Sequence, residues 1–193
     1  EYLAEMESGR IDRIEVENQQ IKSELDQQLQ EEGTTENSEE TAALIRRQKE
    51  IARNETLKEV CKYYQPGARR SGRGGAKYTY VTLENSQGEE TNVIKTGEKC
   101  RLRLGYKIEE ELRSVRFSLG ITRDDGVYTY GTCSEYKEGI KETGEVILTF
   151  SNALLKGKYV LDLWLETLEG EALDSIYSLM PIIVNTDSDE ERG

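Results

Sequence analysis

Histidine is absent from this chain of 193 residues, and proline, cysteine and tryptophan are scarce. Histidine is the commonest general base, metal ligand and triad member, so its absence argues against an enzyme and against a metal site. The cysteines, Cys61, Cys100 and Cys133, are odd in number and lack the CxxC spacing of zinc or redox sites. We therefore expect no catalysis, no metal and no cofactor, and we interpret the cysteines as reduced thiols of a cytoplasmic protein.

Long apolar runs and an excess of positive charge are also missing. No run of about 18 apolar residues occurs, and residues 1–20 lack the basic start and apolar stretch of a signal peptide, so we expect no direct insertion into a membrane. The formal net charge is −12. Binding to nucleic acid relies on clustered Lys and Arg that neutralise phosphates, so nucleic acid is not an expected partner.

Glycine is nearly absent from residues 1–65, and helical patterns occupy that part. The series Ile11, Ile14, Asn18, Ile21 and Leu25 follows 3-4 spacing and predicts a helix over residues 10–30. It is either a short coiled-coil seam or an amphipathic helix packed on its own neighbour, and both interpretations stay open. A second helix is predicted from about residue 39 to 63, ended by Pro66-Gly67. Residues 1–65 are thus predicted to form an α-helical hairpin arm.

Residues 66–75 (PGARRSGRGG) are basic and rich in glycine, as phosphate-binding loops are. The stretch has no Gly-Lys-Ser/Thr ending, and no helical pattern follows it, so backbone amides would not converge on a phosphate. We interpret it as a flexible or turn-forming connector.

From Ala76 onward the apolar period changes from 3.6 to 2, with glycine and Asx turns between short runs. This pattern predicts an antiparallel β-sandwich, immunoglobulin-like or jelly-roll, over residues 76–186, followed by a disordered acidic tail at 187–193. The predicted strands are residues 77–84, 99–108, 114–122, 127–133, 145–151, 158–166 and 175–184.

The alternation of apolar and polar residues along each strand predicts which side chains face away from the core. In 158–166, Tyr159, Leu161, Leu163 and Leu165 should face inward. Asp162, Trp164 and Glu166 should then face outward, and an outward tryptophan is unusual. Trp164 would either stack on a sugar ring, with Asp162 and Glu166 accepting hydroxyl hydrogen bonds, or pack beneath the helical arm or a dimer mate. Asp162 and Glu166 would be roughly 13 Å apart along the strand, too far for a glycosidase pair, so we expect surface charge.

Other outward residues are candidates for the same role. Arg101, Arg103 and Arg116 would form a bidentate site for a phosphate or an acidic sugar if their strands are neighbours, and otherwise a charged solvated face. Tyr128 and Tyr130 would line a glycan groove or close the edge of the core. The sequence does not separate these alternatives.

Several short motifs carry a resemblance to a known family. Leu154-Leu155-Lys156-Gly157-Lys158-Tyr159 looks like the tyrosine corner of immunoglobulin-like sandwiches. More widely, the order of elements after Gly67 resembles the C-terminal, glycan-binding domain of Wzt-type ATP-binding subunits of polysaccharide (O-antigen) ABC transporters. The matching segments are Arg70 to Ala76, with Ser71 where an aromatic is usual, Gly97-Glu98, Asp124-Asp125-Gly126, Gly131-Thr132, with Cys133 departing from the pattern, Leu154 to Tyr159 and Leu173-Asp174.

The resemblance implies a function and a setting. It implies a module that recognises the terminus of a lipid-linked O-antigen or similar surface glycan before export, at the inner face of the plasma membrane. Glu1-Tyr2-Leu3 resembles the end of the family's nucleotide-binding domain, so the parent ATPase would precede this chain and connect it to the membrane subunit of the transporter. Dimeric ATPases imply a homodimer with two glycan sites. The alternative is a dimerisation or scaffold domain that binds no glycan.

Overall fold

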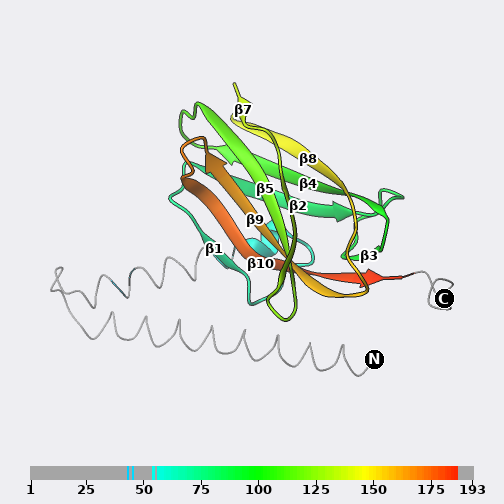
Figure 1. Ribbon diagram of the computed structural model, residues 1–193. Helices are drawn as coiled ribbons and strands as arrows, with labels where there is room; N and C mark the ends of the chain where they lie inside the picture. The colour runs from blue at the N-terminus through cyan, green and yellow to red at the C-terminus, as the bar shows by residue number, and fades with distance from the viewer. Residues whose placement is uncertain (1–42, 44, 46–53, 55, 187–193) are drawn as a thin grey trace.

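The computed structural model describes Ala43, Ile45, Asn54 and residues 56–186. One short helix and ten strands occupy the described residues, and the strands form two sheets (Figure 1). The elements are α3 (Leu57–Val60), β1 (Arg69–Ser71), β2 (Ala76–Glu84), β3 (Val93–Lys95), β4 (Lys99–Ile108), β5 (Ser114–Arg123), β6 (Tyr128–Cys133), β7 (Lys137–Glu138), β8 (Thr143–Ser151), β9 (Gly157–Thr167) and β10 (Ala172–Asn185).

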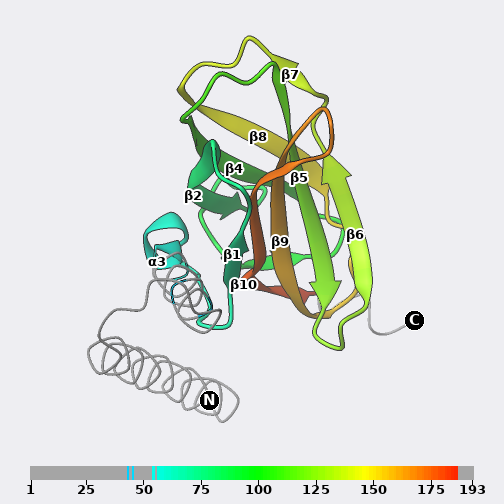
Figure 2. The ribbon, with the colours of Figure 1, turned by 90° about the vertical axis from the view of Figure 1, so that its left-hand side faces the viewer.

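The larger sheet has seven strands in the order β1-β10-β9-β5-β6, with β3 beside β10 and β7 beside β5 (Figure 2). The smaller sheet has the order β2-β4-β8. All pairings are antiparallel except that of β3 with β10. The prediction of a mainly β, antiparallel fold is confirmed, and each of the seven predicted strands is present to within a few residues.

The two sheets share one core, as the two-residue period predicts. The inward sets on β4, β5 and β9 are buried, and Phe117 of β5 lies 6.2 Å from Tyr78 of β2 and 5.2 Å from Tyr106 of β4 between ring centroids. Burial of such aromatic and aliphatic side chains is the main stabilising contribution to a sandwich of this kind. The sheets therefore pack face to face as an open sandwich.

A buried ion pair connects the two sheets at one edge. Arg70 of β1 donates from Nε and Nη2 to the two carboxylate oxygens of Asp174 on β10, at 2.8 and 2.7 Å. Asp174 also accepts the backbone N–H of Tyr78 at 2.8 Å, and Arg70 donates to the Tyr78 carbonyl. Arg70 and Ser71 were predicted to lie in a connector, but they belong to β1, which is too short to give a sequence pattern.

The tyrosine corner is also present. The hydroxyl of Tyr159 donates to the backbone oxygen of Leu155 at 2.8 Å, which fixes the chain as it enters β9. The segment before β9 is also tied to β3, because the side-chain N–H of Asn152 donates to the Lys95 carbonyl. The start of β9 is thus held in place by a hydrogen bond as well as by core packing.

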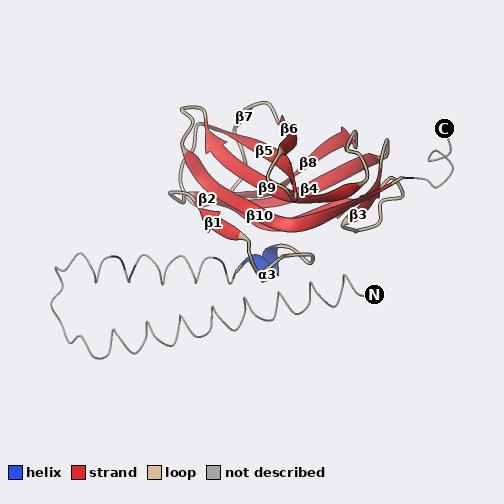
Figure 3. Ribbon diagram, turned by 60° about the horizontal axis from the view of Figure 1, so that its bottom comes forward, coloured by secondary structure: helices blue, strands red, loops and turns tan. Residues whose placement is uncertain are grey.

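Helix α3 falls within the range of the second predicted helix, and Figure 3 shows it on the side of the sandwich where β1 and β10 run. It buries Leu57 and Val60, and it ends at Val60, three residues before the predicted end at Tyr63, because the backbone of Cys61 is extended. The predicted coiled-coil seam and the predicted tail at 187–193 lie outside the described residues. Within the described part of the chain, no helix combines the length and apolar character that crossing a membrane requires.

Candidate functional site

A hollow of about 330 Å³ lies on the face of the seven-stranded sheet that points away from the core. We call it the outer groove. Three neighbouring strands, β5, β6 and β9, supply its walls (Figure 2). The residues that line it are Arg116, Ser118, Leu119, Tyr128, Gly131, Thr132, Cys133, Trp164 and Glu166.

Strand register brings these side chains together. Ser118 of β5 faces Trp164 of β9 on one side and Cys133 of β6 on the other. Two residues earlier, Arg116 faces Glu166. Because successive side chains alternate between faces, the buried residues between these positions point into the core, and Arg116, Ser118, Cys133, Trp164 and Glu166 share the opposite face. Thr132 is paired with the core residue Leu119, so its side chain lies on the inner side of the sheet and its backbone borders the groove.

Glycines let the aromatic rings lie against the sheet. A Cβ atom at Gly120 would come within 2.6 Å of Trp164 Cη2 and 2.9 Å of Tyr128 Cε2, and one at Gly131 would meet the Tyr128 hydroxyl. Tyr177 of β10 packs edge-on against Trp164, with ring centroids 6.1 Å apart. The rings of Trp164 and Tyr128 therefore rest directly on the backbone at Gly120 and Gly131, which form a glycine floor beneath them.

An ion pair lies beside the rings. Arg116 Nε donates to Glu166 Oε1 at 2.7 Å, and Nη2 makes a second, shorter contact with the same oxygen. The guanidinium also lies over the ring of Tyr136, 4.8 Å from its centroid. The hydrogen bond to Glu166 raises the pKa of Arg116, so the guanidinium stays charged and engaged.

Four of the eight residues predicted to bind a glycan meet in this groove, namely Trp164, Glu166, Arg116 and Tyr128. Tyr130 takes the other role that the sequence left open. Its ring packs 5.7 Å from that of Phe150 and closes the edge of the core.

The prediction that Asp162 faces solvent is wrong. Its carboxylate is buried, and it accepts hydrogen bonds from the backbone N–H of Ser178 at 2.7 Å and from the hydroxyl of Thr122 at 3.1 Å. Ser178 has a φ of 53° within an irregularity of β10 between Ile176 and Met180. Asp162 therefore stabilises the strained turn of β10 that carries Tyr177.

The three-arginine anion site does not form. Arg101 and Arg103 lie on β4 in the smaller sheet, which is not a neighbour of β5 and Arg116. Both pair with Glu84, at 2.9 and 3.3 Å, and Arg103 also contacts Glu145 at 2.7 Å. They form the charged face that was the alternative interpretation.

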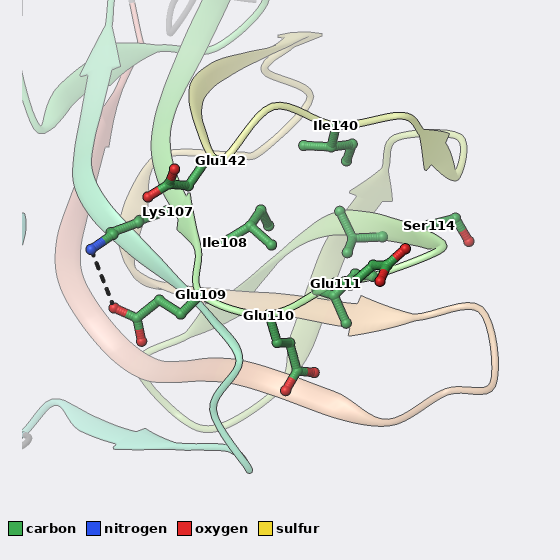
Figure 4. Close-up of a pocket in the computed structure, with 10 residues that line it drawn as sticks. Lys107, Ile108, Glu109, Glu110, Glu111, Ser114, Ile140 and Glu142 are labelled. Atoms are coloured by element: carbon green, nitrogen blue, oxygen red, sulfur yellow. Dashed lines mark ion pairs between the residues drawn. The ribbon is translucent and has the colours of Figure 1, made fainter.

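A larger hollow, of about 620 Å³, opens at the end of the sandwich between residues 107–115 and 140–142 (Figure 4). Its lining combines the apolar side chains of Ile108 and Ile140 with several carboxylates. Glu109 Oε1 lies 3.8 Å from Lys107 Nζ. Its lining residues include no aromatic ring, so it offers a sugar less than the outer groove does.

The comparisons with known proteins agree with this fold. The sequence pattern of the Wzt C-terminal domain matches residues 67–193. The chain belongs to the Wzt C-terminal domain family. This family is associated with polysaccharide ABC transporters.

Solved structures give the same answer for the fold. The crystal structure of the C-terminal domain of Wzt has a TM-score of 0.61 and 20% identity, covering 65% of this chain and 82% of that one. A Niemann-Pick type C2 protein from Japanese carpenter ant has a TM-score of 0.42 and 12% identity, covering 60% of this chain and 98% of its own, and carries no further argument. No curated protein matches.

The motifs that resemble the Wzt family have different roles in the structure. Arg70 and Asp174 make the buried pair of the larger sheet that hydrogen-bonds to the Tyr78 backbone of the smaller one. Glu98 accepts hydrogen bonds from the backbone N–H groups of Ser86 and Lys95. Gly131 and Thr132, in contrast, line the outer groove. Only this last motif therefore belongs to the candidate site.

Sequence reasoning missed several groove residues. Ser118, Thr132 and Cys133 are ordinary strand residues, and only the strand order places them in the groove. Tyr177, which packs on Trp164 from β10, was not predicted either. Gly120 and Gly131 carried a usable signal, because glycine inside a strand often marks a close approach of another group.

Proposed function

We propose that the outer groove binds the end of a surface polysaccharide for an ABC exporter, without catalysis. The observation that carries this proposal is the pair of rings, Trp164 and Tyr128, resting on a glycine floor beside hydroxyls and an ion pair. A sugar presents an apolar C–H face that covers an aromatic ring, and its hydroxyls need donors and acceptors at the rim. Ser118 and the Arg116–Glu166 pair supply them.

The carboxylates support a binding role and not hydrolysis. Asp162 is buried with both oxygens hydrogen-bonded, and Glu166 is engaged with Arg116. Neither is placed as the free acid and base pair that a glycosidase uses. The groove is open and preformed, as binding sites for small ligands usually are.

The proposed setting is the cytoplasmic face of the plasma membrane, with the parent ATPase connecting the domain to the membrane subunit of the transporter. A homodimer would present two grooves to one polysaccharide, and the second contact would benefit from a high effective concentration. The glycan would be an O-antigen or a related lipid-linked polymer.

The test is a titration of the 193-residue chain with oligosaccharides from the native polysaccharide, followed by NMR and by fluorescence. Trp164 is the single tryptophan, so both signals report on the groove. We expect saturable shifts of the Trp164 indole and of Thr132. Replacing Trp164 by Ala should weaken binding by about 2 kcal/mol, or roughly 30-fold.

The matched control is Tyr80→Ala, which removes an aromatic ring from the outer face of the smaller sheet and should leave the affinity unchanged. Sedimentation of the same samples addresses the scaffold alternative. A concentration-dependent dimer with no change at Trp164 at any oligosaccharide concentration would favour a scaffold and contradict glycan binding.

A further inference from the structure

The charge of the outer groove is balanced internally. Arg116 is the one cationic residue among those that line it, and Glu166 is the one anionic residue. They occupy directly opposed positions on β5 and β9 and contact each other through two nitrogens of the guanidinium. The Nε–Nη2 edge of the guanidinium is thus occupied by a carboxylate, and the negative charge of that carboxylate lies beside the donors that remain.

Two further features hold Arg116 in place. Tyr136 lies against the guanidinium plane, with its centroid 4.8 Å from Cζ. The side chains of Arg116 and Glu166 are 35% and 21% exposed, so water screens the pair only in part. An anionic ligand would have to displace Glu166 or approach the carboxylate that already neutralises Arg116, and both are unfavourable.

The charge of the whole chain acts in the same direction. Its formal net charge is −12, which repels phosphorylated or uronate-bearing glycans before they reach the groove. The hydroxyl of Ser118 and the rings of Trp164 and Tyr128 carry no charge and suit a neutral sugar.

We propose that the outer groove selects uncharged chain ends and that Glu166 is the specificity-determining residue that excludes anionic ones. This inference rests on the proposed function, since it names the class of glycan taken by the same groove. Glu166 acts by occupying Arg116, which would otherwise be a bidentate site for phosphate.

The first experiment needs no knowledge of the sugar. Inorganic phosphate is titrated into the 15N-labelled chain while the Arg116 Nε–H resonance is followed, at constant ionic strength. The unmodified protein should show no saturable shift up to about 20 mM, whereas Glu166→Gln, which keeps the shape and removes the charge, should bind phosphate at least tenfold more tightly. Saturable binding at Arg116 in the unmodified protein would overturn the inference.

The second experiment uses a glycan array that carries neutral bacterial oligosaccharides and their phosphorylated and uronate-containing counterparts. The unmodified chain should retain neutral members at least tenfold better than matched anionic ones, and Glu166→Gln should reduce that ratio to within threefold. Preferential retention of anionic members would contradict the selectivity and leave glycan binding intact. Retention of no glycan by either protein would contradict the proposed function itself.

Glu145→Gln is the matched control, because it removes one negative charge from an arginine pair on the smaller sheet. It alters the net charge as much as Glu166→Gln does, so it separates a local effect from general electrostatics. We expect it to leave the neutral-to-anionic ratio within twofold of that of the unmodified chain. A change as large as that of Glu166→Gln would show that net charge, and not Glu166, sets the selectivity.

Discussion

The outer faces of the two sheets are built from the same kinds of residue and differ in what remains accessible. On the smaller sheet, Glu84 lies between Arg101 and Arg103, and Glu145 accepts hydrogen bonds from Arg103 and Tyr80. These polar side chains form one continuous network of ion pairs and hydrogen bonds. On the larger sheet a single ion pair lies to one side, and two aromatic rings and the hydroxyl of Ser118 border a hollow.

The comparison extends to the backbone. Each face has a glycine under an aromatic ring, since a Cβ at Gly105 would collide with the ring of Tyr80 as one at Gly120 would with Trp164. The tyrosine on the smaller sheet then donates to Glu145, which raises the pKa of Tyr80 and lowers that of Glu145. Partners across the strands, and not outward orientation alone, therefore decide whether a face can receive a ligand.

The largest expected effect is a loss of stability at the junction of the two sheets, where the Arg70–Asp174 pair hydrogen-bonds to the Tyr78 backbone. Asp174→Ala removes the acceptor of the Tyr78 N–H and leaves the Arg70 guanidinium buried without its partner. Breaking a buried pair in this way costs about 3–5 kcal/mol of unfolding free energy. Urea unfolding followed by Trp164 fluorescence measures it, and Asp174→Asn should lose less because it keeps an acceptor.

The control for this junction is Glu109→Ala, which removes an exposed ion pair with Lys77 and should leave the free energy of unfolding almost unchanged, because water screens exposed pairs. Equal losses in Asp174→Ala and Glu109→Ala would mean that the buried pair is not what holds the sheets together.

A smaller effect is expected from a methyl group on the groove floor. Gly120→Ala would push the Trp164 and Tyr128 rings off the backbone, and we expect glycan affinity to fall about tenfold, or about 1.4 kcal/mol. Gly105→Ala should displace Tyr80 in the same way and leave affinity within twofold. Calorimetric titration of both variants measures the two affinities. An equal loss of glycan affinity in the two would contradict the difference between the two outer faces.

Much of this arrangement could be predicted from the alternation of residues along each strand. That alternation placed Trp164, Glu166 and Arg116 on outer faces, because the core needs every second side chain. It could not show that Arg116 meets Glu166 and that Arg101 does not, because strand order is set by contacts between distant segments. The family motifs likewise indicated the fold without locating the groove.

Asp162 shows a different limit. It has the same parity as Trp164, yet it is buried because β10 departs from regular pairing beside it and directs the Ser178 N–H toward its carboxylate. An irregularity in one strand thus changes the environment of a residue on its neighbour. The sequence around Asp162 contains no sign of it, and Ser178 is not a residue type that favours positive φ.

The smallest expected effect is on the rate at which the cysteines are alkylated. Cys61 and Cys100 are buried, and burial raises the pKa of each thiol to about 11. Cys133 is exposed at the rim of the outer groove. Since the thiolate is the reactive form, iodoacetamide at pH 8 should modify Cys133 alone in the folded chain, and all three cysteines in urea. Mass spectrometry of the digested protein identifies the modified sites.

Bound glycan should then slow the alkylation of Cys133 about threefold, because a ligand over Trp164 covers the same rim. The matched reporter is Thr149→Cys, at an exposed position opposite Arg101 on the smaller sheet, whose alkylation rate should not respond to glycan. Protection at both positions, or at neither, would remove the distinction between the two faces. Protection at Cys133 that disappears in Trp164→Ala would tie it to the rings of the groove.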